Sequence, residues 1–167
     1  IPGFLRAKFS HPLIGRCFMA GEAKRIYLDM NILAYVANTK APQHQAALEI
    51  FRPTEREILC VSSQVLAEFY SYITNPAILA TPLRPTEAII RINRICQMPH
   101  ICLLSTPVEL FEGWIGLLAE RPVSNGGVFD LLHIGIMLAH DVTTIYTFNI
   151  KDFSWCSQIE AIAPSHR

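Results

Sequence analysis

The stretch RIYLDMNILAYV, residues 25–36, decides the fold. Its apolar start predicts a short strand over 26–29, and apolar residues resume at helical spacing beyond Asn31, where a helix is expected to open. One acid, Asp29, stands where the strand passes into the helix. An acid in that place is either a turn or helix N-cap residue or a functional group, and the stretch alone leaves both open.

The same alternation of strand and helix continues along the chain. We predict further strands at 57–61, 100–105 and 143–148, an edge strand at 157–163, and helices at 42–51, 62–73, 84–98, 107–120 and 128–141. This order favours an α/β fold, a three-layer α/β/α arrangement with a central parallel sheet of four or five strands. The helix at 128–141 is apolar almost all round, so we expect it to be buried.

The length of the chain predicts one domain. Its 167 residues, 51% of them apolar, suffice for a single core. We expect residues 1–24 to be an N-terminal extension outside the core fold and residues 25–167 to form the domain itself. The sequence contains no run of about 18 apolar residues, so a membrane-spanning helix is not expected.

Charge and cysteine content narrow the class of protein. The 14 basic and 14 acidic residues give a formal net charge of zero, so no overall field attracts nucleic acid or a membrane. A polyanionic partner would therefore need a local site. Five cysteines are scattered without a CxxC motif, which predicts reduced thiols, no zinc site and a cytoplasmic location.

Several other polar residues are expected near Asp29, at the carboxyl edge of the predicted sheet. Ligands of parallel α/β sheets bind at the carboxyl ends of the strands, and Asn149 and Asp152 follow the strand predicted at 143–148. Taken singly, each such residue has a structural explanation. Glu68 could be a solvated helix acid, and Asp130 an acid favoured by a helix N-terminus. Asn149 and Asp152 could be ordinary loop and capping residues.

Taken together, these residues occur in four segments with the order and context of a known family. The segments are YLDMNILAY (27–35), SSQVLAEFYSYI (62–73), FDLLHIGIMLAH (129–140) and IYTFNIKDF (145–153). Over roughly residues 25–163 the chain resembles PIN-domain ribonucleases, and most closely the VapC-like toxins of prokaryotic toxin–antitoxin pairs. The last two segments, separated by one short turn, are the most specific part of the resemblance.

The resemblance implies a set of site residues. The catalytic positions of the family fall on Asp29, Glu68, Asp130 and Asn149, where many members carry Asp at the last. The first three are the implied metal ligands. Further supporting residues are Asn31, Asp152 and His133, of which the histidine has the alternative of being a hydrogen-bonded core residue.

The chemistry of a metal-dependent nuclease explains this choice of residue types. Hard cations such as Mg²⁺ or Mn²⁺ prefer oxygen ligands, and a set of Asp, Glu and Asn side chains offers them. Carboxylates that lie close together repel one another unless a cation neutralises them. The cation also reverses the local sign of charge, so a phosphodiester can approach. Asn31 and Asn149 would then position waters by hydrogen bonds.

Three functions remain open at this point. The resemblance implies a Mg²⁺- or Mn²⁺-dependent endoribonuclease that is inhibited by a small antitoxin protein and forms a homodimer. The alternative is a catalytically weak PIN-like module that binds RNA or docks a protein, which Asn149 in place of Asp encourages. A phosphoryl-transfer enzyme with Asp29 as nucleophile, like the haloacid-dehalogenase-like phosphatases, is disfavoured because Asn31 stands where a second Asp is needed.

Overall fold

A five-stranded parallel sheet forms the centre of the computed structural model, which describes residues 23–52 and 54–165. The strands are β1 (Lys24–Leu28), β2 (Glu57–Ser62), β3 (Ile101–Leu104), β4 (Thr144–Tyr146) and β5 (Glu160–Ile162). They lie in the order β3-β2-β1-β4-β5, and all four neighbouring pairs are parallel. The predicted number and direction of the strands are confirmed.

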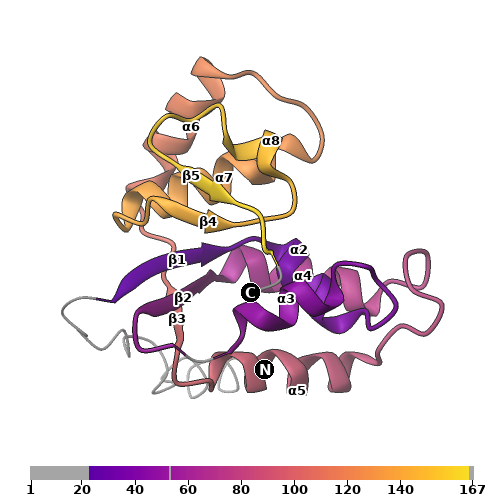
Figure 1. Ribbon diagram of the computed structural model, residues 1–167. Helices are drawn as coiled ribbons and strands as arrows, with labels where there is room; N and C mark the ends of the chain where they lie inside the picture. Colours follow the sequence, from indigo (N-terminus) through magenta and orange to yellow (C-terminus); the bar gives the residue numbers. More distant parts are fainter. Residues whose placement is uncertain (1–22, 53, 166–167) are drawn as a thin grey trace, which may run out of the picture.

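Helices cover both faces of this sheet. They are α2 (Met30–Ala37), α3 (His44–Ile50), α4 (Ser63–Thr74), α5 (Pro85–Cys96), α6 (Leu110–Glu120), α7 (Gly127–Ala139) and α8 (Ile150–Phe153). Figure 1 shows α2 to α5 grouped together and α6 to α8 as a second group beside β4 and β5. The predicted three-layer α/β/α architecture is therefore confirmed.

The strand order explains why the helices divide into two groups. The chain first moves outward from β1 through β2 to β3, and then returns to the opposite side of β1 to form β4 and β5. Right-handed crossovers that run in opposite directions place their helices on opposite faces of the sheet. The order reverses between β1 and β4, and this switch point is where open α/β sheets bind ligands.

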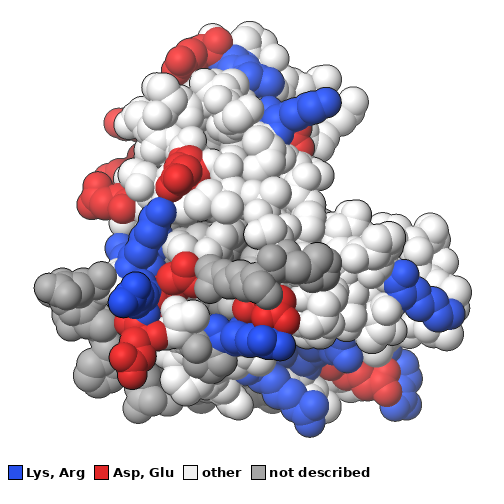
Figure 2. All heavy atoms as spheres, viewed as in Figure 1, with Lys and Arg blue, Asp and Glu red and all other residues white. Residues whose placement is uncertain are grey.

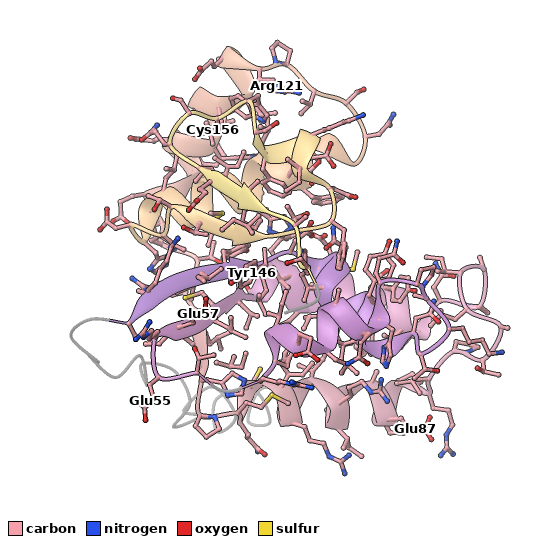
Figure 3. All side chains as sticks on the ribbon, viewed as in Figure 1. Glu55, Glu57, Glu87, Arg121, Tyr146 and Cys156 are labelled. Carbon is pink, nitrogen blue, oxygen red and sulfur yellow. The ribbon has the colours of Figure 1, made fainter. Side chains whose placement is uncertain are left out.

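The core consists of the apolar residues of the strands and of the helix faces that pack on them. Among the largest fully buried side chains are Tyr27, Phe69, Met137 and Phe153. Helix α7 contributes six buried residues between Leu131 and Met137, so the prediction of a buried helix is confirmed. Tyr146 on β4 donates a hydrogen bond across β1 to Glu57 of β2 at 3.1 Å, and Figure 3 labels both residues.

Element boundaries differ from the predictions by a few residues. Strand β1 begins at Lys24, and β4 ends at Tyr146 because the next side chain, Thr147, bonds to the backbone N–H of Asn149 and turns the chain. The short helix α8 was not predicted, since four residues are too few to show a helical period. Residues 1–22 of the expected N-terminal extension lie outside the described residues.

Two further expectations from composition can be compared with the described part of the chain. Residues 23–52 and 54–165 contain no helix that is long and apolar enough to cross a membrane. Cys60, Cys96 and Cys156 are free, whereas Cys102 on β3 is disulfide-bonded, so the prediction of reduced thiols is wrong for that residue. On the face drawn in Figure 2, basic and acidic side chains are interspersed, which fits the absence of a global field.

Candidate functional site

Asp29 lies directly after β1, at the carboxyl edge of the sheet, with only 8% of its surface exposed. Its Oδ1 accepts a hydrogen bond from the backbone N–H of Asn31 at 3.4 Å, so Asp29 is the N-cap of α2. Its Oδ2 accepts bonds from the Thr147 hydroxyl and the Asn31 side-chain amide, both at 2.6 Å. The N-cap interpretation is confirmed, but Oδ1 retains a lone pair for a ligand.

Asn31 connects β1 to the segment that follows β4. Its amide nitrogen donates to Asp29 Oδ2 and, at 3.1 Å, to Thr147 Oγ1, while its amide oxygen accepts from the backbone N–H of Phe148 at 3.3 Å. Both amide hydrogens thus point at protein atoms. In this structure Asn31 orients Asp29, which is a different task from the predicted positioning of waters.

Glu68 projects from the middle of α4 toward α7. Its Oε1 lies 3.2 Å from Nε2 of His133, and the Gln64 side-chain amide one turn earlier donates to the same oxygen. Burial raises the pKa of Glu68, but the hydrogen bond and attraction of His133 and the bond from Gln64 outweigh it, so the net pKa is lowered. Glu68 is therefore held as a carboxylate beside a histidine rather than on a solvated helix face.

His133 belongs to a buried chain of polar groups behind the acids. Its Nδ1 lies 3.0 Å from the hydroxyl of Tyr27 on β1, which in turn lies 2.6 Å from the hydroxyl of Ser62 at the end of β2. All three residues are at most 1% exposed. Burial raises the pKa of Tyr27 far above its ordinary value, so the phenol stays protonated. The histidine is thus both a hydrogen-bonded core residue and a neighbour of Glu68.

Asp130 lies in the first turn of α7, where the other acids influence it. Burial raises its pKa to about 6, and the carboxylates of Asp152, Asp29 and Glu68 add to the rise while His133 opposes it. Burial likewise raises the pKa of Asp29, against the hydrogen bond from Thr147. These mutual effects show that the structure brings the predicted acids Asp29, Glu68, Asp130 and Asp152 into one neighbourhood.

Asn149 takes a more peripheral place. It is exposed and precedes α8, and its backbone N–H donates to Thr147 Oγ1 at 2.8 Å, while its side chain makes no capping bond to that helix. The link between Asn149 and Asp29 therefore runs through Thr147. Asp152, three residues later, is half-buried and close enough to Asp130 to raise its pKa.

The donor set fits a hard divalent cation by its chemistry. The candidate ligands Asp29, Glu68 and Asp130 offer carboxylate oxygens, and the raised pKa of Asp130 records a repulsion that a cation would relieve. Within the described residues, the acids are close enough to influence one another's pKa, but no three His, Cys, Asp or Glu side chains already converge on one metal position. Mg²⁺ commonly binds through one or two carboxylates, waters and substrate phosphate, so a preassembled cage is not required.

Sequence reasoning missed three residues that shape this site: Thr147, Tyr27 and Ser62. The Thr147 hydroxyl donates one hydrogen bond and accepts two, and these three bonds join Asp29, Asn31 and Asn149. A polar residue immediately after a buried strand was the available signal for Thr147. Tyr27 and Ser62 gave no local signal, because only the parallel register places them beside α7.

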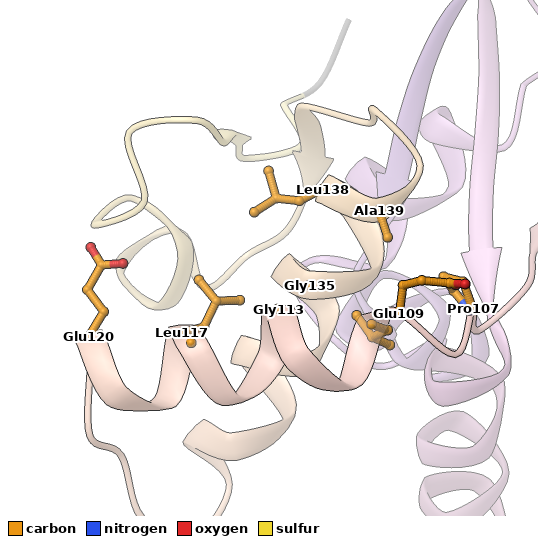
Figure 4. Close-up of a pocket in the computed structure, with 10 residues that line it drawn as sticks. Pro107, Glu109, Gly113, Leu117, Glu120, Gly135, Leu138 and Ala139 are labelled. Carbon is orange, nitrogen blue, oxygen red and sulfur yellow. The ribbon is translucent and has the colours of Figure 1, made fainter.

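The site is distinct from a groove between α6 and α7. This groove has a volume of about 600 Å³, and Figure 4 shows its lining, which includes Leu117 and Glu120 of α6 and Leu138 of α7. None of the candidate acids lines it. The candidate site is thus a polar cluster at the sheet edge rather than this apolar groove.

Comparison with known proteins shows the family and the fold. The chain is 28% identical over 128 residues to ribonuclease VapC24 of Mycobacterium tuberculosis. The aligned region covers 76% of this chain and 88% of that protein. Its fold is similar to that of VapC20 from M. tuberculosis, a toxin that cleaves the sarcin-ricin loop, with a TM-score of 0.60, 16% identity and coverage of 78% of this chain and 95% of that one.

A second solved structure with the same fold is VapBC2 from Rickettsia felis bound to a promoter DNA fragment. It has a TM-score of 0.60 and 18% identity, and the match covers 83% of this chain and 98% of that one. The PIN domain profile matches residues 26–154, which include every candidate site residue described above. The chain therefore belongs to the PIN domain family.

Proposed function

We propose that this protein is a Mg²⁺- or Mn²⁺-dependent endoribonuclease that cleaves RNA phosphodiesters at the acidic cluster of Asp29, Glu68 and Asp130. The observation that carries the proposal is the gathering of Asp29, Glu68, Asp130 and Asp152 from different elements into one neighbourhood, where Thr147 holds Asp29 and His133 holds Glu68. Acids that repel one another at the switch point of a parallel sheet are costly for a purely structural site. They are useful where a cation is to be bound.

The three carboxylates would hold the cation, and Asp152 would supplement them. When bound, such an ion neutralises the acids, binds the phosphate and lowers the pKa of a coordinated water. The protein supplies the geometry. Thr147 and Asn31 fix Asp29, and His133 fixes Glu68, whose lowered pKa keeps it ionised so that it can accept a proton from the attacking water. Asn149 is exposed at the periphery of the cluster, where its side-chain amide would contact the substrate.

Similarity to ribonuclease VapC24 and to toxin structures supports RNA as the substrate and a toxin as the biological role. We propose that a small antitoxin inhibits the enzyme and that the protein forms a homodimer in the cytoplasm. Large apolar side chains stay exposed on α5 and α6, as a surface covered by partners would require: Ile89, Ile90, Phe111 and Ile115. Light scattering of the purified chain would test the dimer.

A nuclease assay tests the central proposal. The purified protein is incubated with mixed RNA oligonucleotides and Mg²⁺ or Mn²⁺, beside Asp29→Asn and beside Asp141→Asn as a matched control. Asparagine also caps helices well, so Asp29→Asn should keep the fold and lose one ligand charge. We expect metal-dependent cleavage that Asp29→Asn abolishes and that the control retains. Equal cleavage by all three proteins, or cleavage in chelator, would overturn the proposal.

The second candidate function is a catalytically weak PIN-like module that binds RNA or docks a protein. Two observations favour it: Asn149 removes one charge from the cluster, and the described residues hold no ready-made three-ligand metal position. In the same assay this candidate predicts retention of RNA without cleavage. If the protein retards RNA in a gel-shift measurement, with the same affinity in the presence and absence of divalent cations and without cleavage, the binding module is favoured over the nuclease.

A further inference from the structure

A buried hydrogen-bonded chain links the three elements that carry the candidate acids. It runs from Ser62 through Tyr27 and His133 to Glu68, with distances of 2.6, 3.0 and 3.2 Å. Tyr27 is two residues before Asp29 on β1, and His133 is one turn after Asp130 on α7. The series therefore connects the strand that precedes Asp29, the helix that carries Asp130, and Glu68 itself.

The other hydrogen bonds of these residues show which atom donates and which accepts at each step of this hydrogen-bonded series. Ser62 Oγ already accepts the backbone N–H of Val65 at 3.3 Å as the N-cap of α4, so its own hydrogen is free to go to Tyr27. The Tyr27 hydroxyl then donates to Nδ1 of His133. The remaining ring hydrogen is on Nε2, which faces Glu68. In this arrangement the Ser62 and Tyr27 hydroxyls and both ring nitrogens of His133 each have a hydrogen-bond partner.

We infer that Tyr27 is a positioning residue of the nuclease: by donating to His133 Nδ1, it fixes the imidazole with its Nε2–H on Glu68 and so holds that carboxylate toward the other acids. The activity part of this inference rests on the proposed function. Glu68 needs such support, because its side chain has three rotatable bonds and is 22% exposed. Groups that orient ligands in this way contribute strongly at metal sites.

Tyr27→Phe removes one hydroxyl and keeps the buried ring, and Tyr146→Phe is its matched control, since Tyr146 also has a buried ring and donates one bond, to Glu57. Removing a group of this kind lowers metal affinity or activity by roughly 10-fold to 100-fold. We expect Tyr27→Phe to lower kcat by about 10-fold with little change in KM for RNA. A kcat equal to that of Tyr146→Phe would overturn the inference.

His133→Gln provides a second variant should Tyr27→Phe be poorly folded. A glutamine amide can replace the Nε2–H donor, whereas His133→Leu cannot, so we expect Gln to recover part of the kcat that Leu loses. Equal losses in both variants, with both folded, would contradict a hydrogen-bonding role for this position. Circular dichroism and thermal melting establish which variants are folded.

Nitrogen NMR of the metal-free protein tests the same contact without RNA cleavage. In wild type, the neutral form of the His133 ring should carry its hydrogen on Nε2 and none on Nδ1, with assignment by loss of the signals in His133→Gln. Tyr27→Phe should give a mixture of the two tautomers, and Tyr146→Phe should not. A neutral ring that carries its hydrogen on Nδ1 in wild type would overturn the inference. Since this measurement needs no activity, failure of the proposed nuclease function would be seen separately, in the cleavage assay.

Discussion

Thr147 Oγ1 lies 2.6 Å from Asp29 Oδ2 and joins residues that are 118 positions apart in the chain. The same hydroxyl oxygen accepts hydrogen bonds from the Asn31 side chain and from the backbone N–H of Asn149. Thr147 is fully buried, so its hydroxyl is not accessible to solvent. One side chain thus locks the end of β1 to the turn after β4, across the switch point of the sheet.

Thr147→Val should therefore destabilise the protein and disorder the site. It keeps the shape but removes the hydroxyl that donates to Asp29 Oδ2 and that accepts from the Asn31 amide and the Asn149 N–H. A buried polar group that loses its partner costs about 1–3 kcal/mol. Thr144→Val is the matched control, because Thr144 is also buried but its hydroxyl makes a single bond to Glu160, which is exposed. Urea unfolding of both variants checks the prediction. An equal loss of stability in the two variants would mean that the Thr147 bonds contribute no more to the free energy of unfolding than the single Thr144 bond does.

Asp130→Asn should raise the melting temperature of the metal-free protein above about pH 6. The raised pKa of Asp130 means that its charged form is disfavoured on folding, so burial and repulsion outweigh the attraction of the α7 N-terminus. Because the side chain is partly exposed, screening reduces the gain to roughly 1 kcal/mol. Asp141→Asn, in an exposed turn with positive φ that Asn tolerates, is the control.

The sign of the pH dependence follows from the same shift. Between pH 3.8 and about 6 the folded state binds more protons at Asp130 than the unfolded state, so the free energy of unfolding falls as pH rises through this window. Thermal melts of wild type and Asp130→Asn along a pH series should converge toward the acid end and separate above it. A variant that is less stable than wild type at neutral pH would show that Asp130 acts mainly as a helix-terminus acid.

Local patterns in the sequence were sufficient for the architecture but not for the hydrogen bonds of the site. Strand–helix alternation predicted the parallel sheet, and the position of Asp29 after an apolar strand predicted its place at the sheet edge. The roles of Thr147 and Tyr27 depend on contacts between residues 118 and 106 positions apart. Such pairs are set by strand register and by the docking of α7, which no local period records.

Asn149→Asp should strengthen metal binding and weaken the metal-free fold slightly. A carboxylate added at this position, two residues after the Thr147 that binds Asp29, increases both the attraction for a divalent cation and the repulsion among the acids. We expect the rise in melting temperature on adding Mn²⁺ to be larger for this variant than for wild type. Asn125→Asp, in an exposed turn on the loop before α7, is the control. An unchanged response to Mn²⁺ would place Asn149 outside the cation site.

Glycines on α6 and α7 should respond to alanine in opposite directions. A Cβ at Gly113 or Gly116, both inside α6, would contact nothing within 4 Å, so alanine should stabilise the protein by about 0.5–1 kcal/mol at each position through helix propensity. At Gly135 of α7, labelled with Gly113 in Figure 4, a Cβ would lie 2.8 Å from Leu110 Cδ1.

Leu110 is buried, and its Cδ1 methyl must move before a Cβ can be placed at Gly135. Gly135→Ala should therefore destabilise by about 1 kcal/mol or more. Urea unfolding of the three variants measures these differences. The double variant Gly135→Ala with Leu110→Ala should cost less than the sum of the single changes, because the smaller residue at 110 removes the clash. Additive losses would mean that the cost at Gly135 arises from the α7 backbone rather than from its contact with α6.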